Sequence, residues 1–71
     1  MSVDINIKFG KRLRVLREKF GYTQKELSEL AGVGYKHYQD LEGENPPSAR
    51  LDCVAKLAKA FKMTPSKLLD F

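Results

Sequence analysis

Apolar residues recur at helical spacing along most of this sequence, and no segment alternates apolar and polar residues over a strand's length. In residues 5–20, for example, Phe9, Leu13, Leu16 and Phe20 fall on one stripe of a helix. This pattern excludes a sheet-based fold and predicts an all-α protein. Because the chain has 71 residues, we expect a single domain over residues 1–71 with a small core.

Turn and capping residues divide the chain into five short helices. Gly21 is placed to end the first helix, and Thr23 and Glu26 have the spacing of a capping box that opens a second. The second helix is expected to end near residue 31, before Gly32, and a third to cover residues 35–42. The inward side chains of these two helices are predicted to be Leu27, Leu30, Ala31, Tyr38 and Leu41.

The adjacent prolines Pro46 and Pro47 mark the clearest loop, since they cannot continue a helix. Ser48 is expected to cap a fourth helix after this loop. Thr64 followed by Pro65 has the order of an N-cap and a first helical residue, and predicts a last short helix. The inward face of the fourth helix is predicted to carry Leu51, Val54, Leu57, Ala58 and Phe61.

The second and third helices are too short to bury much alone, and Gly32-Val33-Gly34 joins them. A turn of this kind between two short helices is typical of a helix-turn-helix. On residues 35–42 the face opposite Tyr38 and Leu41 is polar. A helix in the major groove reads base edges with such a face, although any solvated helix face also carries polar residues. The side chains on it are Tyr35, Lys36, Gln39 and Asp40.

These side chains have distinct base preferences. Lys36 can donate to guanine and Gln39 can pair with adenine, while Tyr35 can contact a thymine methyl or a phosphate. Asp40 is unfavourable beside polyanionic DNA unless it accepts a hydrogen bond from the cytosine amino group or pairs with Lys36, four residues earlier. Gln24 begins a helix whose first N–H groups attract anions, so it is either a phosphate contact or an ordinary exposed residue.

The order and spacing of several pieces resemble the phage-repressor and Cro-like family of DNA-binding domains, also called the Xre family. The resemblance covers about residues 7–70 and implies a compact five-helix, lambda-repressor-like fold with a helix-turn-helix at its second and third helices. The matching pieces are Leu13-x-x-Leu16-Arg17, Thr23-Gln24-x-Glu26-Leu27-Ser28-x-x-Ala31-Gly32-Val33, Leu41-Glu42, Asn45-Pro46, Leu57-Ala58-Lys59-Ala60-Phe61 and Pro65-x-x-Leu68-Leu69.

The resemblance also implies roles for individual residues. Base contacts fall to the positions of Tyr35, Lys36 and Asp40, and the glutamine that matches Gln24 holds the DNA backbone. Thr23, next to it, is a further candidate for a phosphate contact. Arg17 lies at the border of the core, and the family pairs an arginine there with a glutamate, here Glu42. We expect this pair to be structural and partly buried. One departure is Gly34, which lacks the hydroxyl usual before the recognition helix.

The net charge of +4 is unevenly distributed, with +4 on residues 1–20, −3 on residues 21–45 and +3 on residues 46–71. The acidic part contains the helix-turn-helix. If DNA binds, phosphate attraction must therefore come from the flanks, for which Lys11, Arg14 and Arg50 are the candidates, or the affinity is modest.

No set of residues in this sequence points to catalysis or to a metal. His37 has no second ligand at metal spacing and is predicted to pack between the second and third helices. Cys53 is the only cysteine, which excludes an internal disulfide, and is predicted to be a small hydrophobe. We therefore expect no enzyme activity, no cofactor and no metal.

The sequence thus predicts a sequence-specific regulator of transcription, of repressor or controller type, that binds double-stranded operator DNA through residues 35–42. Family members usually act as homodimers, and Leu68, Leu69 and Phe71 either form an apolar dimer patch or close the core. No stretch is apolar enough to span a membrane and residues 1–6 lack the form of a signal peptide, so a cytoplasmic location is expected. The alternative is a protein-interaction or antitoxin-like module with weak DNA affinity.

Overall fold

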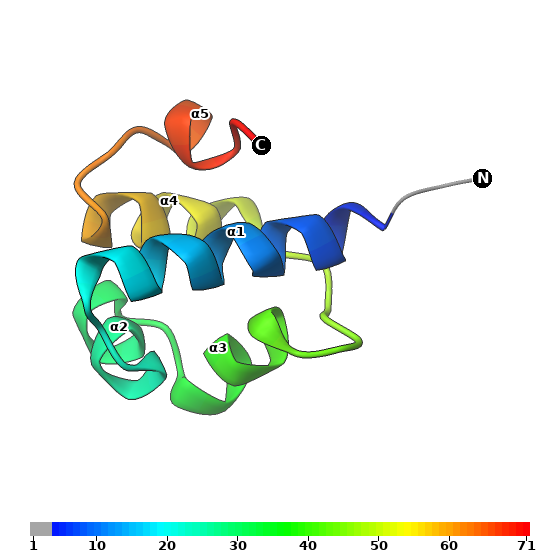
Figure 1. Ribbon diagram of the computed structural model, residues 1–71, viewed down its shortest axis with the longest axis horizontal. Coiled ribbons are helices and arrows are strands. Elements are labelled where there is room, and N and C mark those ends of the chain that lie inside the picture. Colours follow the sequence, from blue (N-terminus) through cyan, green and yellow to red (C-terminus); the bar gives the residue numbers. More distant parts are fainter. Residues whose placement is uncertain (1–3) are drawn as a thin grey trace.

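The chain forms five helices and no strand over residues 4–71, the part that the computed structural model describes (Figure 1). The all-α prediction is confirmed. Residues 1–3 lie outside the described residues. The prediction of one domain over residues 1–71, and the prediction that residues 1–6 are not a signal peptide, both include them. The helices are α1 (Ile5–Phe20), α2 (Gln24–Ala31), α3 (Tyr35–Glu42), α4 (Leu51–Ala60) and α5 (Pro65–Leu68).

Local signals account for most of the helix ends. Gly21 and Gly32 follow α1 and α2 with φ of 78° and 73°, a left-handed conformation that glycine adopts without steric cost. The capping box at the start of α2 is complete. The Thr23 hydroxyl accepts from the Glu26 N–H at 3.0 Å, and the Glu26 carboxylate accepts from the Thr23 N–H at 2.8 Å. The predicted boundaries of α1, α2 and α3 are therefore confirmed.

Helix α1 runs through the middle of the molecule, with α2 and α3 below it and α4 and α5 above it in the view of Figure 1. Helix α3 packs against α1 and α2, and α4 packs against α2 and α5. The core lies between these helices, and the residues buried as a whole are apolar apart from Ser28, whose hydroxyl donates to the Lys25 carbonyl. Its fully buried large side chains are Leu13, Leu27, Tyr38, Leu41, Leu57, Phe61 and Leu68.

Four predictions about the core and the caps were wrong. Leu30 is 55% exposed and Leu51 is 85% exposed, because no helix covers the sides of α2 and α4 on which they lie. Phe20, expected in the α1 stripe, is half exposed at the edge, where its ring packs edge-on against Phe61. Ser48 does not cap α4. The helix begins two residues later, with Arg50 in the N-cap position and no side-chain cap.

Gly10 lies on the buried side of α1 where that helix crosses the end of α3. A Cβ at this position would meet the Leu41 carbonyl oxygen far inside van der Waals contact. The close approach of the two helices therefore requires glycine, in spite of its unfavourable propensity inside a helix. None of the helices in residues 4–71 has the length and apolar character needed to cross a bilayer.

Arg12 connects α1 to the C-terminal segment. Its Nε donates to the Leu68 carbonyl at 3.2 Å and its Nη2 to the Lys67 carbonyl at 3.0 Å. These carbonyls lie at the end of α5, where the Lys67 carbonyl also accepts from the Asp70 N–H at 3.2 Å. The two bonds therefore hold α5 against the middle of α1, while Leu68 fills the core beneath it.

Candidate nucleic-acid interface

Glu42, the last residue of α3, accepts hydrogen bonds from three helices. Arg17 of α1 donates through Nε to Oε2 at 2.8 Å and through Nη2 to Oε1 at 3.1 Å. Gln24 of α2 donates to Oε1 at 3.1 Å, and the Tyr38 hydroxyl donates to Oε2 from one turn earlier in α3. Arg17 also donates to the Tyr22 carbonyl at 2.9 Å. The pair predicted between Arg17 and Glu42 is thus present, as part of a larger network.

Burial and hydrogen bonding oppose each other at this network. Burial disfavours the charged form of Glu42, but the bonds from Arg17, Tyr38 and Gln24 outweigh it and leave the Glu42 pKa below its ordinary value. The Arg17 pKa is raised, chiefly by the hydrogen bond to Glu42. The Tyr38 pKa is also raised, first by burial and then by its bond to Glu42. All three groups therefore keep their hydrogen-bonding state at neutral pH.

The network fixes the position of α3 relative to α1 and α2. Charge-assisted bonds to a carboxylate that is only 4% exposed are strong and directional. Because Gln24 is the first residue of α2 and Glu42 the last of α3, the network also fixes the angle within the helix-turn-helix. The exposed face of α3 is consequently presented as part of a rigid unit.

The start of α2 retains groups that can face a phosphate. One N–H of the Gln24 side-chain amide donates to Glu42, and the second N–H of the same group can donate to a phosphate. The Thr23 hydroxyl accepts from Glu26 and keeps its own proton for donation. The first N–H groups of the helix add a partial positive charge at the same place.

The predicted reading face of α3 is exposed to solvent. Tyr35, Lys36 and Asp40 are exposed and Gln39 is partly so, whereas Tyr38 and Leu41 are buried on the opposite side. Lys36 Nζ lies 3.2 Å from Asp40 Oδ1, so the ion pair considered from their spacing is present. Since the Lys36 and Asp40 side chains are 85% and 48% exposed, the pair contributes little to stability and can open without a large cost.

Two of the predicted phosphate contacts lie beside the C-terminal end of α3. Lys11 and Arg14 line a surface depression of about 370 Å³ together with Gly43 and Glu44, which follow α3 directly. Arg14 is exposed and lies 3.4 Å from Glu18 on its own helix. The third, Arg50, is placed on the other flank of α3.

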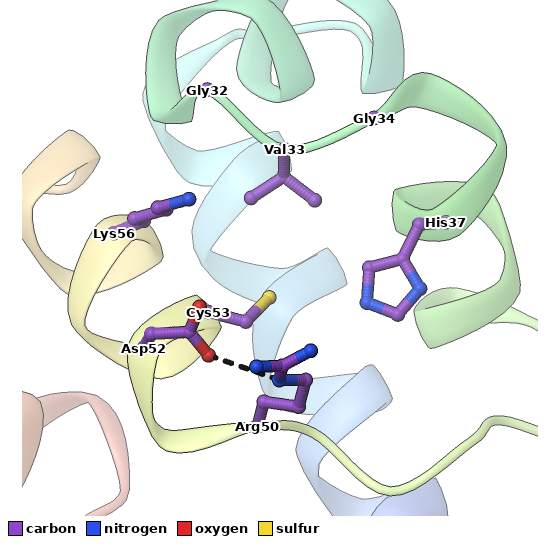
Figure 2. Close-up of a pocket in the computed structure, with 8 residues that line it drawn as sticks. All are labelled: Gly32, Val33, Gly34, His37, Arg50, Asp52, Cys53 and Lys56. Carbon is purple, nitrogen blue, oxygen red and sulfur yellow. Dashed lines mark ion pairs between the residues drawn. The ribbon is translucent and has the colours of Figure 1, made fainter.

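Arg50 lies at the start of α4, across a pocket of about 350 Å³ from the turn of the helix-turn-helix (Figure 2). Val33 and His37 form one side of this pocket, and Lys56 and Cys53 the other (Figure 2). Arg50 pairs with Asp52 at 3.3 Å. His37 therefore faces α4, and its predicted placement between α2 and α3 was wrong. Helix α3 is flanked by cations on both sides.

The described residues contain no group of three His, Cys, Asp or Glu side chains that could hold a metal ion. Cys53, predicted to be a small hydrophobe at the boundary of the core, is buried, and burial is the main reason that its pKa is raised. A thiol in this state is a poor nucleophile.

The fold and this site can be compared with known proteins. A family model described as a helix-turn-helix domain matches residues 10–70. The chain belongs to this helix-turn-helix family. The lambda-repressor-like fold is supported by the crystal structure of the restriction-modification controller protein C.AhdI from Aeromonas hydrophila. That structure superposes with a TM-score of 0.81 at 33% identity and covers 89% of this chain and 94% of the controller.

A protein of Pyrococcus furiosus, named as an HTH-type transcriptional regulatory protein, is 42% identical over 62 residues. The match covers 86% of this chain but 19% of that protein, so the chain spans about a fifth of the length of this relative. The shared part is the helix-turn-helix domain.

Three features of this helix-turn-helix domain were missed in the sequence. The bonds from Gln24 and Tyr38 to Glu42 join residues whose relation depends on the packed angle of α2 and α3. The tie from Arg12 to α5 spans more than fifty residues and has no local signal. Gly10 had a signal, since a glycine inside an amphipathic helix often marks a close approach of backbones.

Proposed function

We propose that this helix-turn-helix domain is a sequence-specific regulator of transcription that binds double-stranded operator DNA by placing α3 in the major groove. The observation that carries the proposal is the exposed polar face of α3, held at a fixed angle by the Glu42 network. Cations at Lys11, Arg14 and Arg50 flank this face. The likeness to the controller protein and to the Pyrococcus furiosus regulator supports the same function.

Within this proposal the contacts divide into two classes. Tyr35, Lys36, Gln39 and Asp40 discriminate bases, and Lys36 leaves Asp40 to donate to guanine. Lys11, Arg14, Arg50 and the start of α2 at Thr23 and Gln24 hold phosphates and set the register without reading sequence. The domain acts without an enzymatic step or a cofactor, as membership of the family supports, and it works in the cytoplasm where the DNA is.

We also propose that the domain acts as a homodimer on near-palindromic DNA, with half-sites about one helical turn (roughly 34 Å) apart. Of the three residues predicted for a dimer patch, Leu68 closes the core, whereas Leu69 and Phe71 are each 46% exposed. Phe71 and Val15 line one surface depression with the stems of Lys8 and Lys11. This surface and Leu69 are candidates for the dimer contact, in place of Leu68.

Selection of bound sequences from random duplex DNA tests the proposal. We expect an enriched motif at low salt. Lys36→Ala and Gln39→Ala should each relax preference at one base position, at a cost of about 1–3 kcal/mol on the preferred sequence. Lys11→Ala and Arg50→Ala should weaken all sequences alike and lower the salt slope by about one each.

Lys67→Ala, on exposed α5, is the matched control and should leave both motif and salt slope unchanged. The absence of any enriched motif at low salt would contradict DNA reading. It would favour the alternative, a protein-interaction or antitoxin-like module on the same fold.

A further inference from the structure

Another concave surface lies between the C-terminal end of α2 and the C-terminal half of α4. This groove has a volume of about 580 Å³. Its floor is apolar, formed by Tyr22, Leu30, Ala31 and Ala60. Leu30 is more than half exposed there, although its position on α2 at helical spacing from Leu27 suggested a core residue. The groove thus leaves a large aliphatic side chain in water beside other apolar surface.

The rim of the groove is basic. Lys56, Lys59 and Lys62 follow one another at three-residue spacing along the end of α4, and Glu29 is the one carboxylate among the lining residues. None of these lysines makes an ion pair with a carboxylate of residues 4–71. The rim therefore carries a net positive charge, three lysines against one glutamate, around an apolar floor.

Lys62, on this rim, has an unfavourable backbone conformation. Its φ of 57° is the one positive φ at a non-glycine residue in residues 4–71. The Met63 N–H bonds to the Ala58 carbonyl and the Lys62 N–H to the Lys59 carbonyl, a helix ending that usually has glycine in the left-handed position. Lysine there costs about 1 kcal/mol in stability. Strain of this kind concentrates at functional positions.

We propose that this groove binds an acidic, amphipathic peptide segment of a partner protein. The apolar side of the segment covers Leu30, Tyr22 and Ala60, and carboxylates on its flanks meet the three lysines. An amphipathic helix laid into an apolar groove is a common mode of peptide recognition. A nucleic-acid phosphate would satisfy the lysines but would leave the apolar floor in water. The groove shares Gly32 and Lys56 with the pocket beside the helix-turn-helix, but none of the four base-reading residues of α3 lines it, so the proposal does not rest on DNA binding.

The test is a selection from a displayed library of random 16-residue peptides against the full chain. We expect enriched peptides that combine glutamate or aspartate with apolar residues at three- and four-residue spacing. Synthetic copies should shift the amide resonances of Tyr22, Leu30 and Ala60. A Lys59→Glu, Lys62→Glu double variant should bind them about tenfold more weakly.

The matched control is the Lys25→Glu, Lys67→Glu double variant, which makes the same change in net charge at exposed positions outside the groove and should retain full affinity. Circular dichroism melting establishes that both variants fold.

Enrichment of peptides without acidic residues, or equal weakening of peptide binding by both variants, would overturn the proposal. So would a change in self-association of the Lys59, Lys62 variant, which would assign the groove to a second copy of this chain. If the Lys59→Glu, Lys62→Glu variant lost as much affinity for DNA as for the peptides, the lysines would be phosphate contacts, and the proposal would also be overturned.

Discussion

Arg17 of α1 and Glu42 of α3 form a two-bond ion pair in which only 13% and 4% of the two side chains are exposed. The pair joins the helix in the middle of the molecule to the last residue of the proposed reading helix. Gln24 and Tyr38 add their hydrogen bonds to the same carboxylate. The orientation of α3 thus depends on one buried acid.

Replacing Glu42 by Gln should lower the free energy of unfolding by about 3 kcal/mol, because Arg17 would remain buried without a counter-charge. Urea denaturation followed by circular dichroism measures the change. Asp40→Asn is the matched control, since it also removes an acid from α3 but belongs to an exposed pair with Lys36. It should change stability by less than about 1 kcal/mol. Equal effects of the two substitutions would show that the network does not stabilise the fold.

Because the pKa of Glu42 is lowered on folding, we expect the stability of the domain to depend on pH. The Glu42 pKa is lowered in the folded state from its ordinary value of 4.5, so its contribution is fully present above pH 4.5. That contribution is lost as the pH falls through the folded-state pKa. The stability difference between the wild type and Glu42→Gln should therefore be constant at neutral pH and narrow below pH 4.5. A difference that widens in acid would mean that the pKa is raised.

Gly10→Ala should destabilise the domain by about 1–3 kcal/mol, because the added methyl group would overlap the Leu41 carbonyl and force α1 away from α3. Ala is ordinarily the better helix former, so the sign alone is informative. Thermal unfolding of Gly10→Ala and the wild type measures this change in stability. The control is Lys11→Ala, a change at the next, exposed position of the same helix, for which we expect less than about 0.5 kcal/mol.

Lys62→Gly should stabilise the domain by about 1 kcal/mol, since glycine adopts a φ of 57° without the clash that a Cβ causes. Lys59→Gly makes the same replacement inside α4 and should destabilise by about 1 kcal/mol. Chemical denaturation of both variants compares them directly. If Lys62→Gly is neutral or destabilising, the lysine side chain contributes to folding rather than to the groove.

Gly34→Ser should stabilise α3 by a few tenths of a kcal/mol. Gly34 is the N-cap of α3 and provides no side-chain bond, and its φ of −58° and open surroundings accept a serine. The added hydroxyl can also donate to a phosphate, so DNA affinity should rise without a change of preferred sequence. A selection experiment in parallel with thermal melting measures both, and a changed motif would instead place residue 34 among the base-reading positions.

Features that depend on neighbours in the chain were predicted well from the sequence. The capping box of Thr23 and Glu26, the glycine ends of α1 and α2, and the start of α5 at Thr64 and Pro65 were all correct. Each depends on bonds across only three or four residues. The inward stripe of α1 was correct for Phe9, Leu13 and Leu16, because its spacing matches the helical period over several turns.

The exposure of individual apolar residues could not be read in the same way. Leu30 and Leu51 lie at helical spacing from core residues, yet no other helix covers them. Periodicity shows which residues share a face of a helix, but it does not show how wide a face the neighbouring helices cover. In a five-helix domain this small, short helices such as α2 bury only a narrow stripe.

By itself, the sequence determined the five helices, their order, and the helix-turn-helix with its polar face, because these follow from local bonds and apolar spacing. Only the tertiary structure decided which side chains meet. It placed Gln24 and Tyr38 on Glu42, Gly10 against the Leu41 carbonyl, and the cations of α1 and α4 on either side of α3. These contacts join residues from separate helices, and their geometry depends on the packing angles that the shared core imposes.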